Sequence, residues 1–133
     1  MLANVLHGGG DVSERDKEGR TGLHNAAIQG DFEAVCALIS AKADVSAVDK
    51  NGFTPLHFAS ASYFVAIARL LIDAGAVIDA EDVHGNTPLF KAVFESRGRG
   101  EMIRLLLDFG ADEHRKNRHG TSPAELAERI CEF

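Results

Sequence analysis

Pairs of large apolar residues recur along the chain, and each pair follows a short alanine-rich stretch. The alanine-rich stretches are Ala26-Ala27, Ala59-Ser60 and Ala92-Val93. The larger apolar pairs are Leu38-Ile39, Leu71-Ile72 and Leu106-Leu107, 33 and then 35 residues apart. This pattern predicts two helices in each unit, because small residues allow close helix packing and larger ones fill the core. The second helix should end near Gly75 or Gly110, where glycine can adopt a left-handed backbone.

Turn and capping residues follow the same period. An aspartate or asparagine recurs three residues before a glycine, which predicts a turn: Asp16, Asp49, Asp82 and Asn117, with Gly19, Gly52, Gly85 and Gly120. A threonine or serine then precedes a helix as its N-cap: Thr21, Thr54, Thr87 and Ser122. The three prolines of the chain all occupy the next position, the first of the helix: Pro55, Pro88 and Pro123.

The phrases that open these units are Thr21-Gly22-Leu23-His24, Thr54-Pro55-Leu56-His57 and Thr87-Pro88-Leu89-Phe90. They resemble the opening of the ankyrin repeat, whose period is 33 residues. The resemblance implies an all-α fold, an ankyrin-repeat solenoid of stacked helix-turn-helix units with hairpin-like turn fingers. We expect one domain over residues 1–133, with full repeats at 16–48, 49–81 and 82–116. A partial N-terminal cap would span 1–15, packing through Leu2, Val5 and Leu6, and a C-terminal cap would span 117–133, with a Ser122–Glu125 capping box.

Composition and charge exclude several function classes. The 133 residues carry 14 Lys and Arg against 20 Asp and Glu, a formal net charge of −6, which argues against general nucleic-acid binding. No run approaches the roughly 18 apolar residues of a membrane span, and the first ten residues lack the positive region of a signal peptide. The two cysteines, Cys36 and Cys131, have no CxxC spacing, so we expect no disulfide framework, no zinc site and a cytoplasmic protein. Cys36 is expected to be a buried small apolar residue.

Candidate catalytic residues are few. His24 and His57 occupy the same position in consecutive units, and the resemblance implies that they bond backbone between repeats; a metal site would need further ligands. His84, His114 and His119 fall in or near turns and are expected at the surface, where His114 and His119 could approach one another. Gly8-Gly9-Gly10 lacks the G-K-[ST] ending of a phosphate loop. We therefore expect no enzyme, no cofactor and no metal.

Three departures from the repeat are visible. Lys42 replaces the glycine that ends the second helix, at a cost of about 1 kcal/mol if its φ is positive. Two extra residues fall within 95–101, where Arg97 and Arg99 either belong to a tolerated insertion or contact an acidic group on a partner. Tyr63-Phe64 replaces the glycine between the two helices, and Tyr63 either packs over the core or is an exposed anchor.

The resemblance to ankyrin repeats implies a concave binding surface, made by the turn fingers and the exposed side of the first helix of each unit. Phe53 and Phe94 are the expected anchors, with Ile28, Val48 and Val83 as further apolar residues facing solvent, although some of these could pack against neighbouring fingers. The predicted partner-binding residues are Lys17, Glu18, Arg20, Ile28, Gln29, Val48, Lys50, Asn51, Phe53, Ser62, Glu81, Val83, His84, Asn86, Phe94, Glu95, Arg97, Arg99, Lys116 and Arg118.

The expected partner is another protein, with no nucleic acid and no membrane, and the free chain is expected to be a monomer. Glu14, Asp16 and Glu18 in the first finger, against Arg115, Lys116 and Arg118 in the last, predict a charge gradient that orients the partner. Residues 96–130 look like the C-terminal half of short bacterial ankyrin proteins, many of which resemble immunity proteins that neutralise a toxin. The alternatives are a general adaptor that joins two proteins and, less favoured, an enzyme that uses the histidines.

Overall fold

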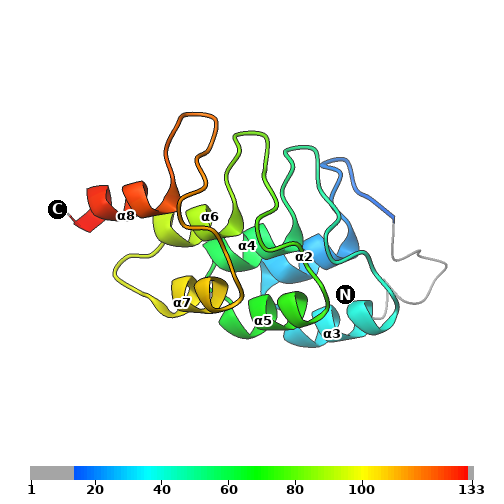
Figure 1. Cartoon of the computed structure of the whole chain (residues 1–133). Coiled ribbons are helices and arrows are strands. Elements are labelled where there is room, and N and C mark those ends of the chain that lie inside the picture. The colour runs from blue at the N-terminus through cyan, green and yellow to red at the C-terminus, as the bar shows by residue number, and fades with distance from the viewer. Residues whose placement is uncertain (1–13, 132–133) are drawn as a thin grey trace.

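The computed structural model describes residues 14–131, and the predicted N-terminal cap contacts of Leu2, Val5 and Leu6 lie outside that range, as does the Gly8-Gly9-Gly10 segment. Within it, the chain forms two rows of helices with loops projecting from one side (Figure 1). The inner row is α2 (Gly22–Gln29), α4 (Pro55–Ala61), α6 (Pro88–Phe94) and α8 (Pro123–Cys131). The outer row is α3 (Phe32–Ser40), α5 (Val65–Asp73) and α7 (Glu101–Asp108). The described part contains one isolated β-bridge, Arg15 with Thr21, so the predicted all-α class is confirmed.

Each inner helix starts where the sequence predicts a cap. The hydroxyl oxygens of Thr21 and Thr54 accept hydrogen bonds from the backbone N–H of His24 and His57, and Thr87 does the same for Phe90. Ser122 and Glu125 form the predicted capping box, with the Ser122 N–H donating to the Glu125 carboxylate at 2.9 Å. This bond holds the pKa of Glu125 below its usual value. The caps satisfy backbone N–H groups that the first turn of a helix leaves free.

The core runs along the stack between the two rows of helices. Its largest fully buried apolar side chains are contributed by every repeat: Leu23, Leu38, Leu56, Leu71, Leu89, Met102 and Leu106. Ala26, Ala59 and Ala92 are also buried, which allows neighbouring inner helices to approach closely. Cys36, in contrast, is only half-buried, so the expectation of a buried cysteine was wrong. No helix of the described residues is long and apolar enough to cross a membrane.

Four loops form a row of fingers along the inner helices, at residues 14–20, 48–53, 81–86 and 116–121 (Figure 1). In each finger the side-chain oxygen of Asp16, Asp49, Asp82 or Asn117 accepts two backbone N–H bonds from residues two and four positions ahead. The glycine between them has a φ of 76–80°, which side chains rarely adopt. Neighbouring fingers are joined by backbone bonds, such as Arg118 N–H to His84 C=O at 2.9 Å.

His24 and His57 bond backbone between repeats, as the resemblance implied. The Nε2–H of His24 donates to the Phe53 carbonyl at 2.8 Å, and that of His57 donates to the Asn86 carbonyl at 2.9 Å. In both rings Nδ1 accepts from the N–H of the capping threonine. Burial lowers the pKa of both histidines, although the carbonyl partner opposes that shift. The neutral ring is therefore the form that joins adjacent repeats.

Each of the three departures from the repeat contains a non-glycine residue with positive φ, and two of these residues stand where other units have glycine. Lys42 has a φ of 70°, whereas Gly75 and Gly110 at the equivalent position have φ values of 100° and 95°. Tyr63 has a φ of 60°, and it stands where the first unit has Gly30, with a φ of 72°. Both non-glycine residues therefore occupy positions that favour glycine. The predicted left-handed ends of the second helices are confirmed.

Candidate functional site: the finger–helix face

We call the surface formed by the fingers and the adjoining sides of α2, α4 and α6 the finger–helix face. Four residues line the corner where fingers meet helices: Arg20, Phe53, Phe58 and Lys91. The guanidinium of Arg20 lies 5.2 Å from the Phe58 ring, and the ammonium of Lys91 lies 5.2 Å from the Phe53 ring. The two phenylalanine rings are 5.3 Å apart. The corner thus consists of two packed aromatic rings with a cation over each, an arrangement that each ring's negative face stabilises.

The five predicted apolar contact residues divide into two groups. Phe94 is 61% exposed, Val48 is 49% exposed and Val83 is 42% exposed. Ile28 and Phe53 are only half-buried, and Phe53 also packs edge-on against His57 at 5.6 Å. For Phe53 the structure therefore favours the alternative of packing against neighbouring side chains, because Phe58 and Lys91 lie against its ring. Of the two predicted anchors, Phe53 and Phe94, the more exposed is Phe94, the last residue of α6.

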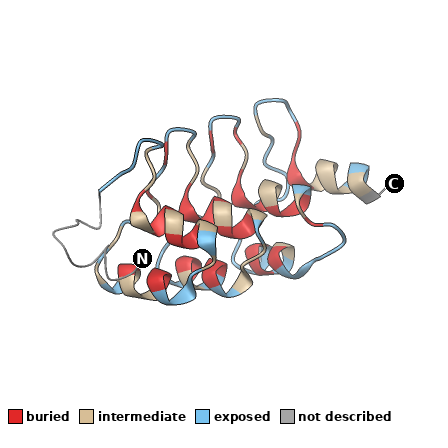
Figure 2. Cartoon of the chain, turned by 180° about the vertical axis from the view of Figure 1, so that it is seen from behind, coloured by how far each residue is buried: buried red, intermediate tan, exposed pale blue. Residues whose placement is uncertain are grey.

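Most of the predicted polar residues lie at the finger tips, which are exposed, whereas the finger bases are buried (Figure 2). The exposed ones are Lys17, Glu18, Gln29, Lys50, Asn51, Ser62, Glu81, His84, Lys116 and Arg118. Arg20, Asn86 and Glu95 are half-buried. The Arg20 Nε lies 3.5 Å from the buried carboxylate of Asp49 in the next finger, and the pair joins the first two repeats.

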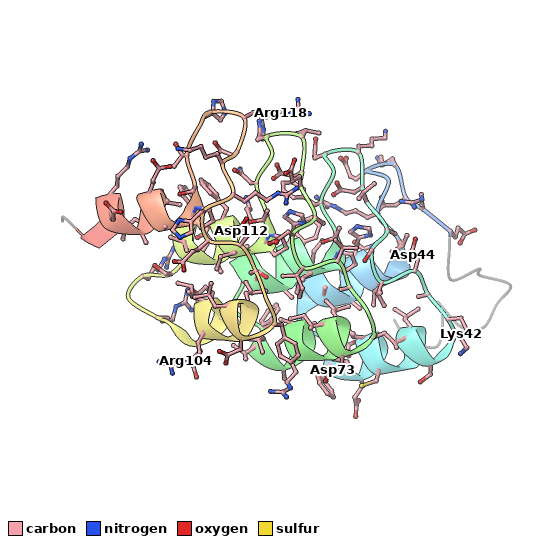
Figure 3. All side chains as sticks on the ribbon, in the orientation of Figure 1. Lys42, Asp44, Asp73, Arg104, Asp112 and Arg118 are labelled. Atoms are coloured by element: carbon pink, nitrogen blue, oxygen red, sulfur yellow. The ribbon has the colours of Figure 1, made fainter. Side chains whose placement is uncertain are left out.

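The predicted charge gradient along the fingers was wrong. The first finger carries Arg15, Lys17 and Arg20 as well as its three acidic residues, so its formal charge is zero. In the last repeat, Arg115 pairs with Glu81 at 2.6 Å and Lys116 pairs with Glu125 at 3.2 Å. Arg118 stands free of such a pair among the described residues, at the tip of the last finger (Figure 3). The exposed charges therefore form a mixed polar rim.

The inserted loop at 95–101 is fastened to its own repeat and to the preceding one. The Arg99 side chain donates to the Ser96 carbonyl at 2.9 Å and to the Glu95 carbonyl at 2.8 Å. Its guanidinium also lies 4.1 Å from the Tyr63 ring centre. Arg99 therefore orders the loop, while Arg97 is exposed with a φ of 50°.

A comparison with protein-family models matches the chain to a family described as ankyrin repeats (3 copies). The match covers residues 1–82 and 23–117, well over half of the chain. The chain belongs to the ankyrin repeat family. A comparison with curated proteins finds no match. Ankyrin repeats indicate a protein–protein interaction module and are generally non-catalytic.

The sequence did not identify Phe58 and Lys91 as residues of the finger–helix face. They occupy the same inner-helix position in consecutive repeats, one residue after His57 and Phe90. A comparison of this position across the repeats could have identified them. It holds Asn25 in the first unit and Leu126 in the last. Beside His84 the structure places His119, with ring centres 6.1 Å apart, rather than pairing His119 with His114 as the sequence suggested.

The ankyrin stack brings together no obvious reaction centre within residues 14–131. No group of three or more His, Cys, Asp or Glu side chains in that range could hold a metal ion. Both buried histidines are bonded on each ring nitrogen, so neither has a nitrogen available to a substrate. What the face offers is exposed apolar area with a polar rim, the composition of a protein interface.

Proposed function

We propose that the finger–helix face binds a partner protein, with Phe94 as its main apolar contact. The single observation behind this proposal is the 61% exposure of Phe94 at the end of an inner helix, in a repeat where its neighbours Ala92 and Val93 are buried. A phenylalanine left in water costs free energy that a partner's apolar surface would recover. Exposed aromatic residues with few rotamers are frequent energetic centres of interfaces.

The corner residues supply the second part of the proposed recognition. Arg20 and Lys91 hold their charges over aromatic rings, so their positions are restrained before a partner arrives. Val48 and Val83 extend exposed apolar area to the neighbouring fingers. A partner that places apolar side chains on Phe94, Val48 and Val83 and a carboxylate near Lys91 would match this face.

The experiment uses a partner isolated by crosslinking in the source cells, purified and titrated calorimetrically. Phe94→Ala should weaken binding by at least tenfold, since truncating a central aromatic residue typically costs 2 kcal/mol or more. The matched control is Phe32→Ala, because Phe32 is 45% exposed but lies on outer helix α3. Equal affinities of Phe94→Ala and the parent, or an equal loss in Phe32→Ala, would refute the proposed surface.

In a narrower form of the proposal, the partner is a toxin that this chain neutralises inside the cytoplasm. Before binding, this chain is a free monomer. It is supported by the resemblance of residues 96–130 to short bacterial ankyrin proteins of the immunity type, and by the net charge of −6, which suits a basic partner. If the isolated partner arrests growth when expressed alone and not when expressed with this chain, the toxin form holds. A harmless partner that binds together with a second protein would favour the adaptor form.

A further inference from the structure

We propose that His84 and His119 together bind a divalent transition-metal ion such as Zn²⁺ between the tips of the third and fourth fingers. Both imidazoles are exposed, and their ring centres lie 6.1 Å apart with an angle of 28° between the ring planes. Imidazole nitrogen is a preferred ligand of Zn²⁺, Ni²⁺ and Cu²⁺. The two histidines lie on fingers of the finger–helix face, but the proposal does not depend on a partner protein binding there.

The backbone beneath both rings is fixed. His84 N–H donates to the Asp82 carboxylate at 2.8 Å, and His119 N–H donates to the Asn117 side chain at 2.9 Å. The two fingers are also joined directly, because Arg118 N–H donates to the His84 carbonyl at 2.9 Å. The two histidines therefore occupy the same position on adjacent fingers, and only their side-chain torsions remain to be ordered by an ion.

The distance between the rings fits a shared ion after a small movement. With Zn–N bonds of about 2.0–2.1 Å, two imidazoles on one tetrahedral ion have ring centres about 5 Å apart. The observed 6.1 Å must therefore shorten by about 1 Å, which rotation of two exposed side chains can supply. The equivalent positions on the first two fingers hold Glu18 and Asn51, so this histidine pair is confined to the last two.

Charged groups on the two fingers affect the strength of the site. The Glu81 carboxylate, on the same finger as His84, is engaged by Arg115 at 2.6 Å, and Arg118, next to His119 in the sequence, adds a positive charge that opposes a bound cation. Two protein ligands leave the remaining coordination positions to water. We therefore expect a micromolar rather than a structural zinc site, one that is selective against Mg²⁺ because Mg²⁺ requires oxygen ligands.

The test is calorimetric titration of ZnCl₂ into the full chain, with MgCl₂ as a parallel titration. We expect one saturable Zn²⁺ site, and a loss of at least tenfold in affinity for either His84→Gln or His119→Gln. Zn²⁺ should also raise the Tm of the parent chain and leave the Tm of His84→Gln unchanged, because an ion stabilises only a form that binds it.

The matched controls replace metal-binding side chains outside the pair: His114→Gln, His7→Gln and Cys36→Ser. His114 is exposed in the same repeat as His84, and His7 lies outside the described residues. These variants should keep the parent affinity. The proposal is overturned if His84→Gln binds Zn²⁺ as tightly as the parent, if any control loses as much affinity as the pair variants, or if no saturable binding occurs below millimolar Zn²⁺.

Discussion

The guanidinium of Arg99 stacks on the ring of Tyr63, 4.1 Å from its centre, and the Tyr63 hydroxyl donates a 2.7 Å hydrogen bond to the Ala92 carbonyl. These two residues belong to two separate departures from the repeat, one in the second unit and one in the third. In the structure they form one contact. Tyr63 accepts a φ of 60° at a glycine position, and its ring provides the surface on which the inserted loop is ordered.

The first prediction concerns this contact. Tyr63→Phe keeps the ring but leaves the Ala92 carbonyl without its partner, so it should lower the free energy of unfolding by about 1 kcal/mol. Arg99→Ala should lower it by a similar amount. In a double-mutant cycle by chemical denaturation, Arg99→Ala should be non-additive by at least 0.5 kcal/mol with Tyr63→Leu, which removes the ring on which Arg99 lies. Strictly additive losses for Tyr63→Leu and Arg99→Ala would show that the loop is ordered without the Tyr63 ring.

The second prediction concerns Lys42. Lys42→Gly should raise the free energy of unfolding by about 1 kcal/mol, since glycine adopts a φ of 70° without the strain of a side chain. The reciprocal variant, Gly75→Lys, should be destabilised by a comparable amount, because Gly75 has the same role and open space around it. Thermal or urea unfolding measures both. A destabilised Lys42→Gly would mean that the lysine side chain contributes more than its backbone costs.

The third prediction concerns pH. Burial holds the pKa values of His24 and His57 below the 6.5 of an unperturbed histidine, so the unfolded chain binds protons more readily than the folded chain. Stability should therefore be complete above about pH 6.5 and fall as the pH is lowered towards the folded-state pKa values. Urea unfolding between pH 7.5 and 5 measures this slope. The His24→Gln/His57→Gln variant should be less stable at pH 7.5 with a shallower slope, and an unchanged slope would contradict the assignment.

The fourth prediction compares two buried aspartates at the same finger position. Neither Asp49 Oδ2 nor Asp82 Oδ2 has a hydrogen-bond partner, but Asp49 has the Arg20 Nε at 3.5 Å, whereas Phe53 stands at the equivalent position for Asp82. Asp49→Asn should therefore cost about 1 kcal/mol more than Asp82→Asn in urea unfolding, because it removes the charge that faces Arg20. Equal losses would show that the arginine does not stabilise its finger.

The parts of the fold that the sequence predicted correctly depend on contacts within one unit, or on contacts that recur in the same way from one pair of adjacent units to the next. The threonine caps, the finger turns and the bonds of His24 and His57 all have this property. The contact between Tyr63 and Arg99 joins two positions that depart from the repeat, so no periodicity indicates it.

The candidate face was predicted only in part, for a related reason. The repeat position identified Phe94, Val48 and Val83 as solvent-facing, and all three are exposed. Whether Phe53 is exposed or packed could not be decided from the repeat, because its exposure depends on Phe58 and Lys91, which differ from repeat to repeat and pack against it. The charge gradient failed because the basic residues of the first finger were left out of the count.

The central claim is that a partner protein binds the finger–helix face, and amide NMR of the labelled chain with the purified partner tests it most directly. We expect signals of residues 48–53, 81–86 and 88–94 to shift or broaden on addition of the partner. Signals of the outer helices α3, α5 and α7 should stay in place. Shifts confined to the outer helices, with the fingers and Phe94 unchanged, would contradict the proposed function.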